Sequence, residues 1–387
     1  MIMADIIIAG IGQTPVGEHW EFSLRSLARQ AIQAAIQDSG GLKPQALFVG
    51  NMLAANLSRQ AHLGALLADY SGLTGIEAET VEAGGASGGA ALRQAYLAIA
   101  SGLVDVALVV GVEKFTDLIG PDLEAALATL ADADYEAIHG LTPSAQAALL
   151  ARRYMHEYQV PADGLAGFPL TAHANAAGNK NAMYRKAITL DAYQKAEPVC
   201  DPLNIFDVAP NLDGAAALVL VRGEFLPKDF PNPLIRLAAS SIATDTFALA
   251  ERRDPLWFGA AQASAEQAFQ KAGIRRDQVD LFEYYDAYSI FAALSLEAAG
   301  FARRGTGWEL ARDAAIALKG QLPCATLGGL KARGNPGGAT GIYQAVDAVT
   351  QLRGLAGLNQ VAGAHTALIQ CLGGPASIAV THILTKV

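Results

Sequence analysis

The chain contains little cysteine. Its 387 residues include three cysteines, Cys200, Cys324 and Cys371, which are too few and too widely spaced for a disulfide framework. No two of them form the C-x-x-C pair that is typical of zinc and redox sites. We therefore expect a protein of the reducing cytoplasm, and we expect Cys200 and Cys324 to be buried, inert thiols.

Long apolar runs and an excess of positive charge are also absent. The strongly apolar stretch of residues 104–112, for example, is interrupted by Asp105 and has about half of the ~20 residues that a membrane-spanning helix needs. The N-terminal residues lack the basic region and the cleavage site of a signal peptide. The 28 basic and 37 acidic residues give a net charge of -9, which argues against nonspecific nucleic-acid binding. A local basic pocket for a phosphorylated ligand is compatible with these numbers.

Motifs for metal and dinucleotide binding are missing. Gly10-Ile11-Gly12 lacks the third glycine and the downstream acidic residue of a nicotinamide site. No H-x-x-x-H or H-x-H spacing occurs, so we predict no metal site. The histidines concerned are His19, His62, His139, His156, His365 and His382.

The residues that are abundant predict a large α/β protein. With 52% hydrophobic and 17% charged residues, the chain can fill two packed units or one large layered unit. Short apolar runs predict buried strands, and a period of three to four residues predicts helices. The predicted strands are 6–10, 47–49, 105–110, 214–221, 234–239, 281–283, 366–369 and 377–384, and the predicted helices are 23–36, 86–101, 255–272 and 341–352.

The middle of the chain differs from its two ends. Between about residues 115 and 199 the hydrophobic periodicity weakens and polar aromatic residues gather, so we expect a loop domain with several short helices around residues 145–158. This predicts an N-terminal half formed by residues 1–117 and 200–230, a loop domain of residues 118–199 and a C-terminal half of residues 231–387. A glycine-rich turn followed by a helix of small residues occurs at 84–91 and again at 334–341, as expected for a duplicated βα unit.

The segment Val81–Leu92 resembles the loop that carries the nucleophilic cysteine in thiolases, with Gly85 at the position of the cysteine. The resemblance extends over nearly the whole chain and is strongest to archaeal-type acetoacetyl-CoA thiolases and to sterol-carrier-protein thiolases. It implies the thiolase fold, with two similar α/β halves that contain mixed five-stranded sheets in five layers, αβαβα, and an inserted loop domain. The other matching segments are 10–14, 49–52, 111–116, 201–203, 213–217, 328–331 and 351–354.

The resemblance also places the residues that a thiolase needs. Gly85 has no side chain to accept an acyl group, and Asn335 stands where the family has the histidine that activates the cysteine. An asparagine donates hydrogen bonds but is no base near neutral pH. Tyr285 replaces the histidine of a His-Asp-Cys-Phe element, and its hydroxyl can polarise a carbonyl, or exchange protons if its pKa is lowered. Cys371, before a glycine pair, matches the acid/base cysteine of biosynthetic thiolases and is a possible proton carrier.

The ligand-binding residues follow from the same resemblance. His173 matches a family segment near the pantetheine and the thioester of acyl-CoA, although a histidine that only braces the loop domain is the alternative. Ser87, in the first glycine-rich turn, and Gly373, in the C-terminal turn after Cys371, are expected ligand contacts. The basic residues near His173 either meet the phosphates of coenzyme A or are ordinary solvated charges; they are Lys180, Arg185 and Lys186.

Two hypotheses of function follow. In the first, the chain is an acyltransferase by family that binds acyl-CoA, has no tightly bound cofactor, does not perform cysteine-dependent thiolysis or Claisen condensation, and forms or cleaves C–C bonds by aldol chemistry with Tyr285 as acid/base. In the second, it is a catalytically silent acyl-CoA-binding or scaffolding subunit that works with a small zinc-ribbon/OB-fold protein. Both expect a homodimer or tetramer.

Overall fold

The computed structural model describes residues 5–387. We expected no signal peptide at the N-terminus, and residues 1–4 of that segment lie outside the described residues. The helices are α1 Leu24–Asp38, α2 Ala54–Leu57, α3 Leu63–Tyr70, α4 Ser87–Ala100, α5 Pro121–Ala128, α6 Pro143–Glu157, α7 Gly167–Ala176, α8 Leu190–Gln194, α9 Gly259–Ala272, α10 Ser289–Ala298, α11 Gly307–Arg312, α12 Gly329–Arg333 and α13 Thr340–Arg353. The strands are β1 Ile6–Gln13, β2 Ala46–Gly50, β3 Glu77–Val81, β4 Val106–Glu113, β5 Pro198–Cys200, β6 Leu203–Asn204, β7 Gly214–Arg222, β8 Ile235–Thr244, β9 Leu281–Glu283, β10 Thr366–Gly373 and β11 Ile378–Lys386.

Nine strands form one mixed sheet in the order β3-β2-β4-β7-β1-β8-β11-β10-β9. The first five come from the N-terminal part of the chain, where β2 runs parallel to β3 and β4, and β7 runs antiparallel to β4 and β1. The last four come from the C-terminal part. The two groups meet at one bridge between Ile7 and Arg236. The sheet is therefore two sheets joined at their edges.

The two sheets have the same topology. In the second one, β9 runs parallel to β10, β11 runs antiparallel to β10 and β8, and a parallel bridge between Phe282 and Cys324 stands where the fifth strand belongs. Backbone hydrogen bonds from Phe282 to Pro323 and from Ala325 to Phe282 extend this bridge. The duplicated α/β unit of the sequence is thus present, with the fifth strand of the second sheet reduced to a single bridge.

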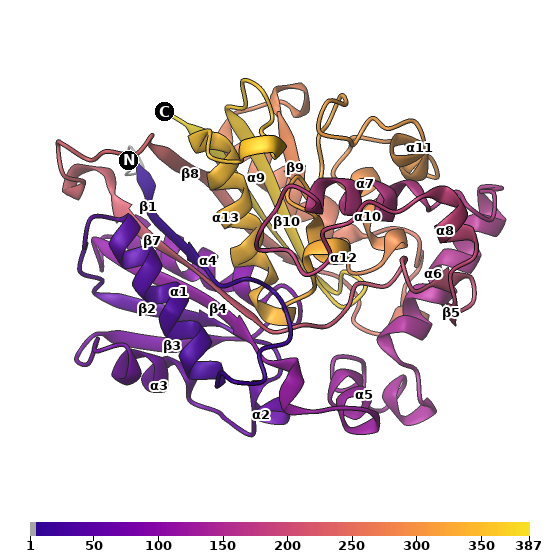
Figure 1. Cartoon of the computed structure of the whole chain (residues 1–387), viewed down its shortest axis with the longest axis horizontal. Coiled ribbons are helices and arrows are strands. Elements are labelled where there is room, and N and C mark those ends of the chain that lie inside the picture. The colour runs from indigo at the N-terminus through magenta and orange to yellow at the C-terminus, as the bar shows by residue number, and fades with distance from the viewer. Residues whose placement is uncertain (1–4) are drawn as a thin grey trace.

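Helices α4 and α13 pack against each other and contact both sheets, so they form the shared central layer (Figure 1). Their contact is close because both helices contain glycine: a Cβ at Gly341 would overlap the backbone nitrogen of Gly89. The outer layers are α1 and α3 on the first sheet and α9 with α10 on the second. The result is the five-layer α/β thiolase fold that the family resemblance implies.

The segment before β7 contains more regular structure than its sequence pattern predicts. The several short helices expected around residues 145–158 are one helix, α6, which begins at Pro143 and is capped by the Thr142 hydroxyl 3.2 Å from the Ala145 N–H. The expectation was wrong because the buried stripe of α6 consists largely of alanine, which a search for large apolar residues underweights. The helix predicted from residue 255 begins at Gly259, since Asp254 to Phe258 form a turn.

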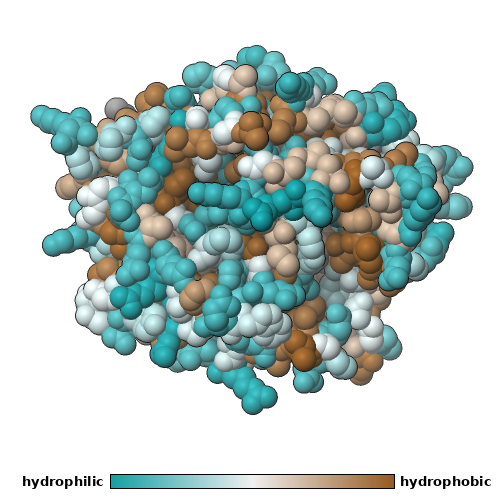
Figure 2. Space-filling model, in the orientation of Figure 1, coloured by the Kyte–Doolittle hydropathy of each residue, from teal (hydrophilic) through white to brown (hydrophobic). Residues whose placement is uncertain are grey.

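The surface has no broad apolar face in the view of Figure 2, where hydrophobic residues occur in small groups among hydrophilic ones. Among residues 5–387, no helix is long and apolar enough to cross a bilayer.

Candidate functional site

The two glycine-rich turns and the segment after β9 meet at a cavity of ≈ 290 Å³, which we call the inner cavity. Such a volume lies at the lower end of the ~300–1,000 Å³ that is common for ligand sites. Gly85, Tyr285 and Asn335, which are far apart in the sequence, all line it. The other lining residues are Met52, Glu124, Leu127, Leu130, Pro143, Ser144, Gln146, Val199, Val208, Ala209, Pro210, Asn211, Ala287, Tyr288, Phe291, Gly374 and Pro375.

The turn that carries Gly85 is held from within. The Ser87 hydroxyl donates to the Gly84 carbonyl at 2.6 Å and accepts from the Ala83 N–H at 2.9 Å. Ser87 is fully buried and does not line the inner cavity, so it braces the turn instead of contacting a ligand there. The N–H groups of Gly84, Ala86 and Ser87 have acceptors within the turn, whereas none of the described residues accepts a hydrogen bond from the Gly85 N–H. That N–H remains available at the cavity wall.

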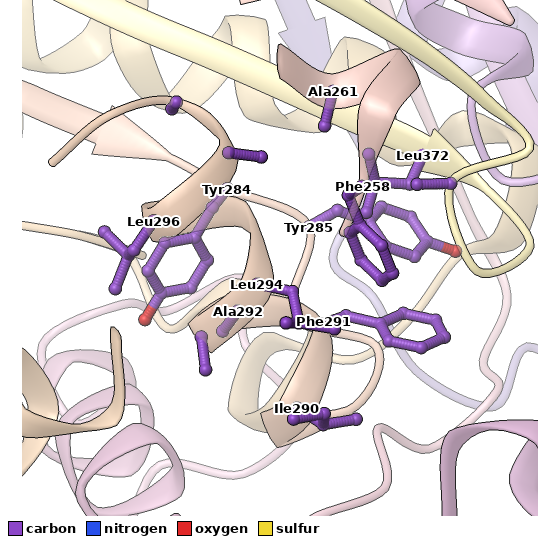
Figure 3. Packing of buried hydrophobic residues seen from close by; sticks show 14 of the residues in the cluster. Phe258, Ala261, Tyr284, Tyr285, Ile290, Phe291, Ala292, Leu294, Leu296 and Leu372 are labelled. Atoms are coloured by element: carbon purple, nitrogen blue, oxygen red, sulfur yellow. The ribbon is translucent and has the colours of Figure 1, made fainter. Parts of the chain in front are cut away.

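The side chain of Tyr285 fills the space that a side chain at position 85 would need. A Cβ built on Gly85 would overlap the Tyr285 hydroxyl and would lie 2.8 Å from both the Tyr285 Cζ and the Leu372 carbonyl oxygen. Figure 3 shows the Tyr285 ring beside Leu372, with its hydroxyl pointing away from Tyr284. The glycine and the tyrosine are therefore complementary, because a larger residue at position 85 excludes this position of the ring.

Tyr285 reaches the cavity because it follows strand β9. Successive side chains of an extended segment point to opposite sides, so Tyr284 enters the core and Tyr285 faces the cavity. Burial raises the pKa of Tyr285 well above its usual value near 10, with smaller contributions from Tyr288 and Cys371. The lowered pKa that base catalysis would favour is absent. The phenol is therefore neutral at physiological pH.

Asn335 and Asn211 form a pair of amides at the cavity. The Asn335 Nδ2 donates to the Asn211 Oδ1 at 3.1 Å, and the Asn335 Oδ1 accepts from the Gly337 N–H at 3.2 Å. Because each amide nitrogen carries two hydrogens, one N–H of Asn335 and the amide nitrogen of Asn211 are left without acceptors among the described residues. Gly85, Asn335 and Asn211 thus bring to one cavity wall N–H groups for which no acceptor is found among the described residues, and such donors can stabilise a negatively charged oxygen.

Cys371 does not lie at this wall. A Cβ on Gly89 would overlap the Cys371 sulfur, and one on Gly341 would lie 3.1 Å from it, so the side chain points between α4 and α13. Cys371 is fully buried, and burial raises the pKa of its thiol to about 12. The position of Cys371 therefore does not suit the proton-carrier role predicted for it. Gly373 lies behind the wall, packed on the Ala83 carbonyl, and Gly374 lines the cavity in its place.

Two further cavities adjoin the inner one. The middle cavity, of ≈ 400 Å³, shares Val199 and residues 208–210 with the inner cavity, and the outer cavity, of ≈ 610 Å³, shares His173, Tyr184 and Phe206 with the middle one. Arg185 and Lys186 line the outer cavity, while Lys180 is exposed and lines none of the three. The three cavities form a path from a basic surface to Tyr285.

His173 lies where the outer and middle cavities meet. Its ring packs edge-on against Phe206 with centroids 5.6 Å apart, its Nδ1 lies 3.3 Å from the Lys186 carbonyl, and burial lowers its pKa. Lys331 also lines the middle cavity, where its Nζ donates to the Asp207 carbonyl at 2.7 Å. Burial lowers the pKa of Lys331 to about 8, against the attraction of Asp286 and Asp207.

Sequence reasoning singled out Gly85, Tyr285 and Asn335 but missed five other polar residues of the inner cavity: Glu124, Ser144, Gln146, Asn211 and Tyr288. A glutamine on the otherwise apolar stripe of α6 was the one signal available for Gln146. Asn211 and Ser144 reach the cavity through tertiary packing alone, and no motif marks them.

The chemistry of the inner cavity is that of hydrogen-bond donors. Its ionisable side chains are Glu124, Tyr285 and Tyr288, and its one hydroxyl nucleophile, Ser144, is paired with the Tyr288 hydroxyl at 3.2 Å. An activated nucleophile needs an adjacent base. No histidine, lysine or cysteine belongs to the lining, and its one carboxylate, Glu124, makes no hydrogen bond to Ser144. No group of three or more metal-binding side chains occurs in the part of the chain that the structure describes. The cavity suits stabilisation of an oxyanion without covalent catalysis.

Known proteins resemble this chain over its full length. Family models described as "Thiolase, N-terminal domain" and "Thiolase C-terminal domain-like" match residues 6–224 and 241–386. An acetyl-CoA acetyltransferase of Methanothermobacter thermautotrophicus is 38% identical over 99% of this chain and 100% of its own length. A 17-hydroxy-3-oxo-4-pregnene-20-carboxyl-CoA lyase of Mycobacterium tuberculosis is 28% identical over 95% and 96%. The solved Ltp2-ChsH2(DUF35) aldolase superposes with a TM-score of 0.84 and 25% identity, covering 100% of this chain and 99% of its own.

Proposed function

The chain belongs to the thiolase family, and we propose that it makes or breaks a C–C bond of a β-hydroxyacyl thioester by aldol chemistry, without an acyl-enzyme. The observation that carries the proposal is the Tyr285 hydroxyl, which occupies the space of a side chain at position 85 in a cavity that has no activated nucleophile. A covalent acyl carrier has no room there. A neutral phenol beside oxyanion donors suits a reaction through an enolate.

In the cleavage direction, the thioester carbonyl accepts hydrogen bonds from the donors of Gly85, Asn335 and Asn211. The bond between Cα and Cβ breaks, its electron pair moves into the thioester as an enolate, and the β-carbon becomes a carbonyl. Tyr285 takes the proton of the β-hydroxyl and delivers its own proton to Cα, so it is neutral before and after the step. In the condensation direction the proton of Cα passes to the Tyr285 oxygen as the phenol delivers its own proton to the new alkoxide, and the raised pKa keeps Tyr285 protonated before and after the step.

Two of the similar proteins agree with this chemistry in their names, since one is a lyase and the other an aldolase. The acetyltransferase is more similar in sequence, but overall identity reports the fold and the ancestry, whereas the reaction depends on the residues at the cavity. The glycine at position 85 therefore outweighs the higher identity in our assignment.

We further propose coenzyme A as the carrier of the acyl group. The path of three cavities offers basic residues for phosphates at its outer end and an enclosed, largely apolar space at its inner end. A small zinc-ribbon/OB-fold partner is part of the proposal, and it is supported by the two-component name of the similar aldolase. Assembly as a homodimer or tetramer and a cytoplasmic location remain predictions.

The test is cleavage of β-hydroxyacyl-CoA by the purified chain, with and without such a partner, measured as release of the carbonyl product and the shorter acyl-CoA. Tyr285→Phe should lower kcat/KM by about 10²- to 10⁴-fold, the usual contribution of a positioned acid or base, and should leave acyl-CoA binding nearly unchanged. Tyr284→Phe is the matched control, because its ring points into the core from the neighbouring position.

Two results would contradict the proposal. One is isolation of a covalent acyl adduct on the chain during turnover. The other is binding of acyl-CoA with no turnover of any β-hydroxyacyl thioester in the presence of the partner, which would favour the silent, scaffolding subunit instead.

A further inference from the structure

The end of the inner cavity beside α5 and α6 has a polar group that the reaction does not use. Gln146, in the first turn of α6, is 4% exposed and lines the cavity. Its backbone N–H bonds to the Thr142 carbonyl, but its side-chain amide has no hydrogen-bond partner within residues 5–387. The amide atoms are accessible from the cavity, since Gln146 is not among the described residues with fully buried, unpaired polar atoms. Because the Gln146 amide lines the cavity, a polar group of a ligand can form the hydrogen bonds that the protein does not provide.

Gln146 is also the one amide on the buried, otherwise largely apolar side of α6. The other buried residues of α6 are apolar except for the Tyr154 hydroxyl, which donates to Glu297 at 2.5 Å. Packing alone would favour an alanine or a leucine at position 146. The amide therefore serves the cavity and not the core of the loop domain.

A second polar group lies next to it. The hydroxyls of Ser144 and Tyr288 are 3.2 Å apart, and burial raises the pKa of Tyr288 to about 12, so both are neutral. One hydrogen bond between two hydroxyls uses one of their two protons, which leaves a donor and several acceptor sites for a ligand. Tyr288 also adjoins the reacting end of the cavity, since it contributes to the raised pKa of Tyr285.

Between these polar groups the cavity wall is apolar, with Leu127 and Leu130 near α5 and Phe291 from α10. The lining includes no lysine, arginine or histidine, and its one charged side chain is Glu124. A carboxylate at this end of a substrate would face a like charge without a cation, which is unfavourable. A neutral oxygen, as hydroxyl or ketone, would find both donors and acceptors.

We propose that Gln146, together with the Ser144–Tyr288 pair, selects acyl groups that carry a neutral oxygen beyond the β-carbon, joined to it by an apolar segment. The inference rests on the proposed function, because it names the substrate class of the same site. Gln146 and Tyr288 are specificity residues here and take no part in the bond-breaking step.

The experiment compares β-hydroxyacyl-CoA substrates of matched chain length that end in a methyl group, a hydroxyl or a carboxylate. At the chain length that fits the cavity, the hydroxyl-terminated substrate should have the highest kcat/KM, about 5- to 100-fold above the methyl-terminated one, as expected when a buried amide gains or lacks its partner. Gln146→Leu should remove this preference, so that the hydroxyl- and methyl-terminated substrates have equal kcat/KM. Gln94→Leu, the same change at an exposed position of α4, is the control.

Tyr288→Phe gives a second, independent variant, and it should reduce the preference in the same direction if Gln146→Leu does not fold. Binding is measured in parallel with acyl-CoA that carries the terminal hydroxyl but no β-hydroxyl, which cannot be cleaved. A preference in binding that Gln146→Leu removes, without turnover of any substrate, would support the inference and overturn the proposed reaction. Turnover with equal preference for methyl and hydroxyl ends, or a preference that both variants retain, would overturn the inference.

Discussion

At the scale of single residues, Gly85 and Tyr285 act as one unit. The two positions depend on each other, since the ring of Tyr285 can occupy its site only because position 85 has no Cβ. A cysteine introduced at position 85 would therefore meet the phenol before it met a substrate, and it would not by itself restore covalent chemistry. The absence of a side chain at position 85 and the position of the Tyr285 ring are therefore one structural feature.

Gly85→Ala tests this complementarity. The added Cβ overlaps the Tyr285 hydroxyl, so the variant should lose about 1–3 kcal/mol of unfolding free energy, the usual cost of overpacking. In a Tyr285→Ala background the same substitution should cost less, giving a coupling energy of about 1 kcal/mol or more in urea unfolding. Gly17→Ala is the control, because its nearest atom, the Met183 sulfur, is at 3.7 Å. Equal costs in both backgrounds would show that the phenol is not the obstacle.

Residue identity also decides how much of the site could be predicted from the sequence. Gly85, Tyr285 and Asn335 stand in family motifs, and the structure brings all three to one cavity. Cys371 stands in a motif as well, but motif position does not specify on which side of β10 its sulfur lies. Asn211 stands in no motif and could not be found, because tertiary packing alone turns its amide toward the cavity. Gln146 stands in no motif either, and its only signal was its place on the otherwise apolar stripe of α6.

At the scale of the elements, strands were easier to predict than the helices of the middle segment. Buried strands such as β4 and β7 are continuous apolar runs, and nothing else of that length fits such a run. Strand β3 has an exposed face and a mostly polar sequence, so it gave no signal. Helix α6 was missed as a single helix because its core stripe is mostly alanine, although Thr142 and Pro143 mark its start as a cap and a first-turn proline.

The contact of α4 with α13 fixes the distance between the two glycine-rich turns, and Gly341→Ala tests it. In an isolated helix this change would stabilise by about 1 kcal/mol, because alanine has the higher helix propensity. Here the Cβ would overlap the Gly89 nitrogen and lie 2.9 Å from its Cα, and backbone cannot move aside as a side chain can. We expect a net loss of about 2–3 kcal/mol in urea unfolding. The sign of the change in unfolding free energy is the test, since a stabilised variant would mean that α4 and α13 do not pack closely.

At the scale of the whole molecule, the charged side chains are distributed unevenly along the three cavities, with basic residues at the outer end. The chain carries a net charge of -9, yet the outer cavity is lined by Arg185 and Lys186 and the inner cavity has Glu124 as its one charged side chain. An anionic carrier is therefore attracted to one end of the path, and its uncharged acyl group is left to fill the other. This arrangement orients a ligand before any specific contact with Tyr285 is made.

Replacement of the two outer basic residues tests that direction. Arg185→Gln with Lys186→Gln should weaken acyl-CoA binding by about 5- to 30-fold at low salt, as expected for two exposed charge pairs, and should leave kcat at saturating substrate unchanged. Because such pairs are screened, the wild-type dissociation constant should rise with ionic strength more steeply than that of the double variant. Lys180→Gln removes a charge from the same segment but not from a cavity wall, so it should change neither quantity by more than about twofold. An equal effect of Lys180→Gln would mean that the segment acts through its general charge and that the phosphates do not bind in the outer cavity.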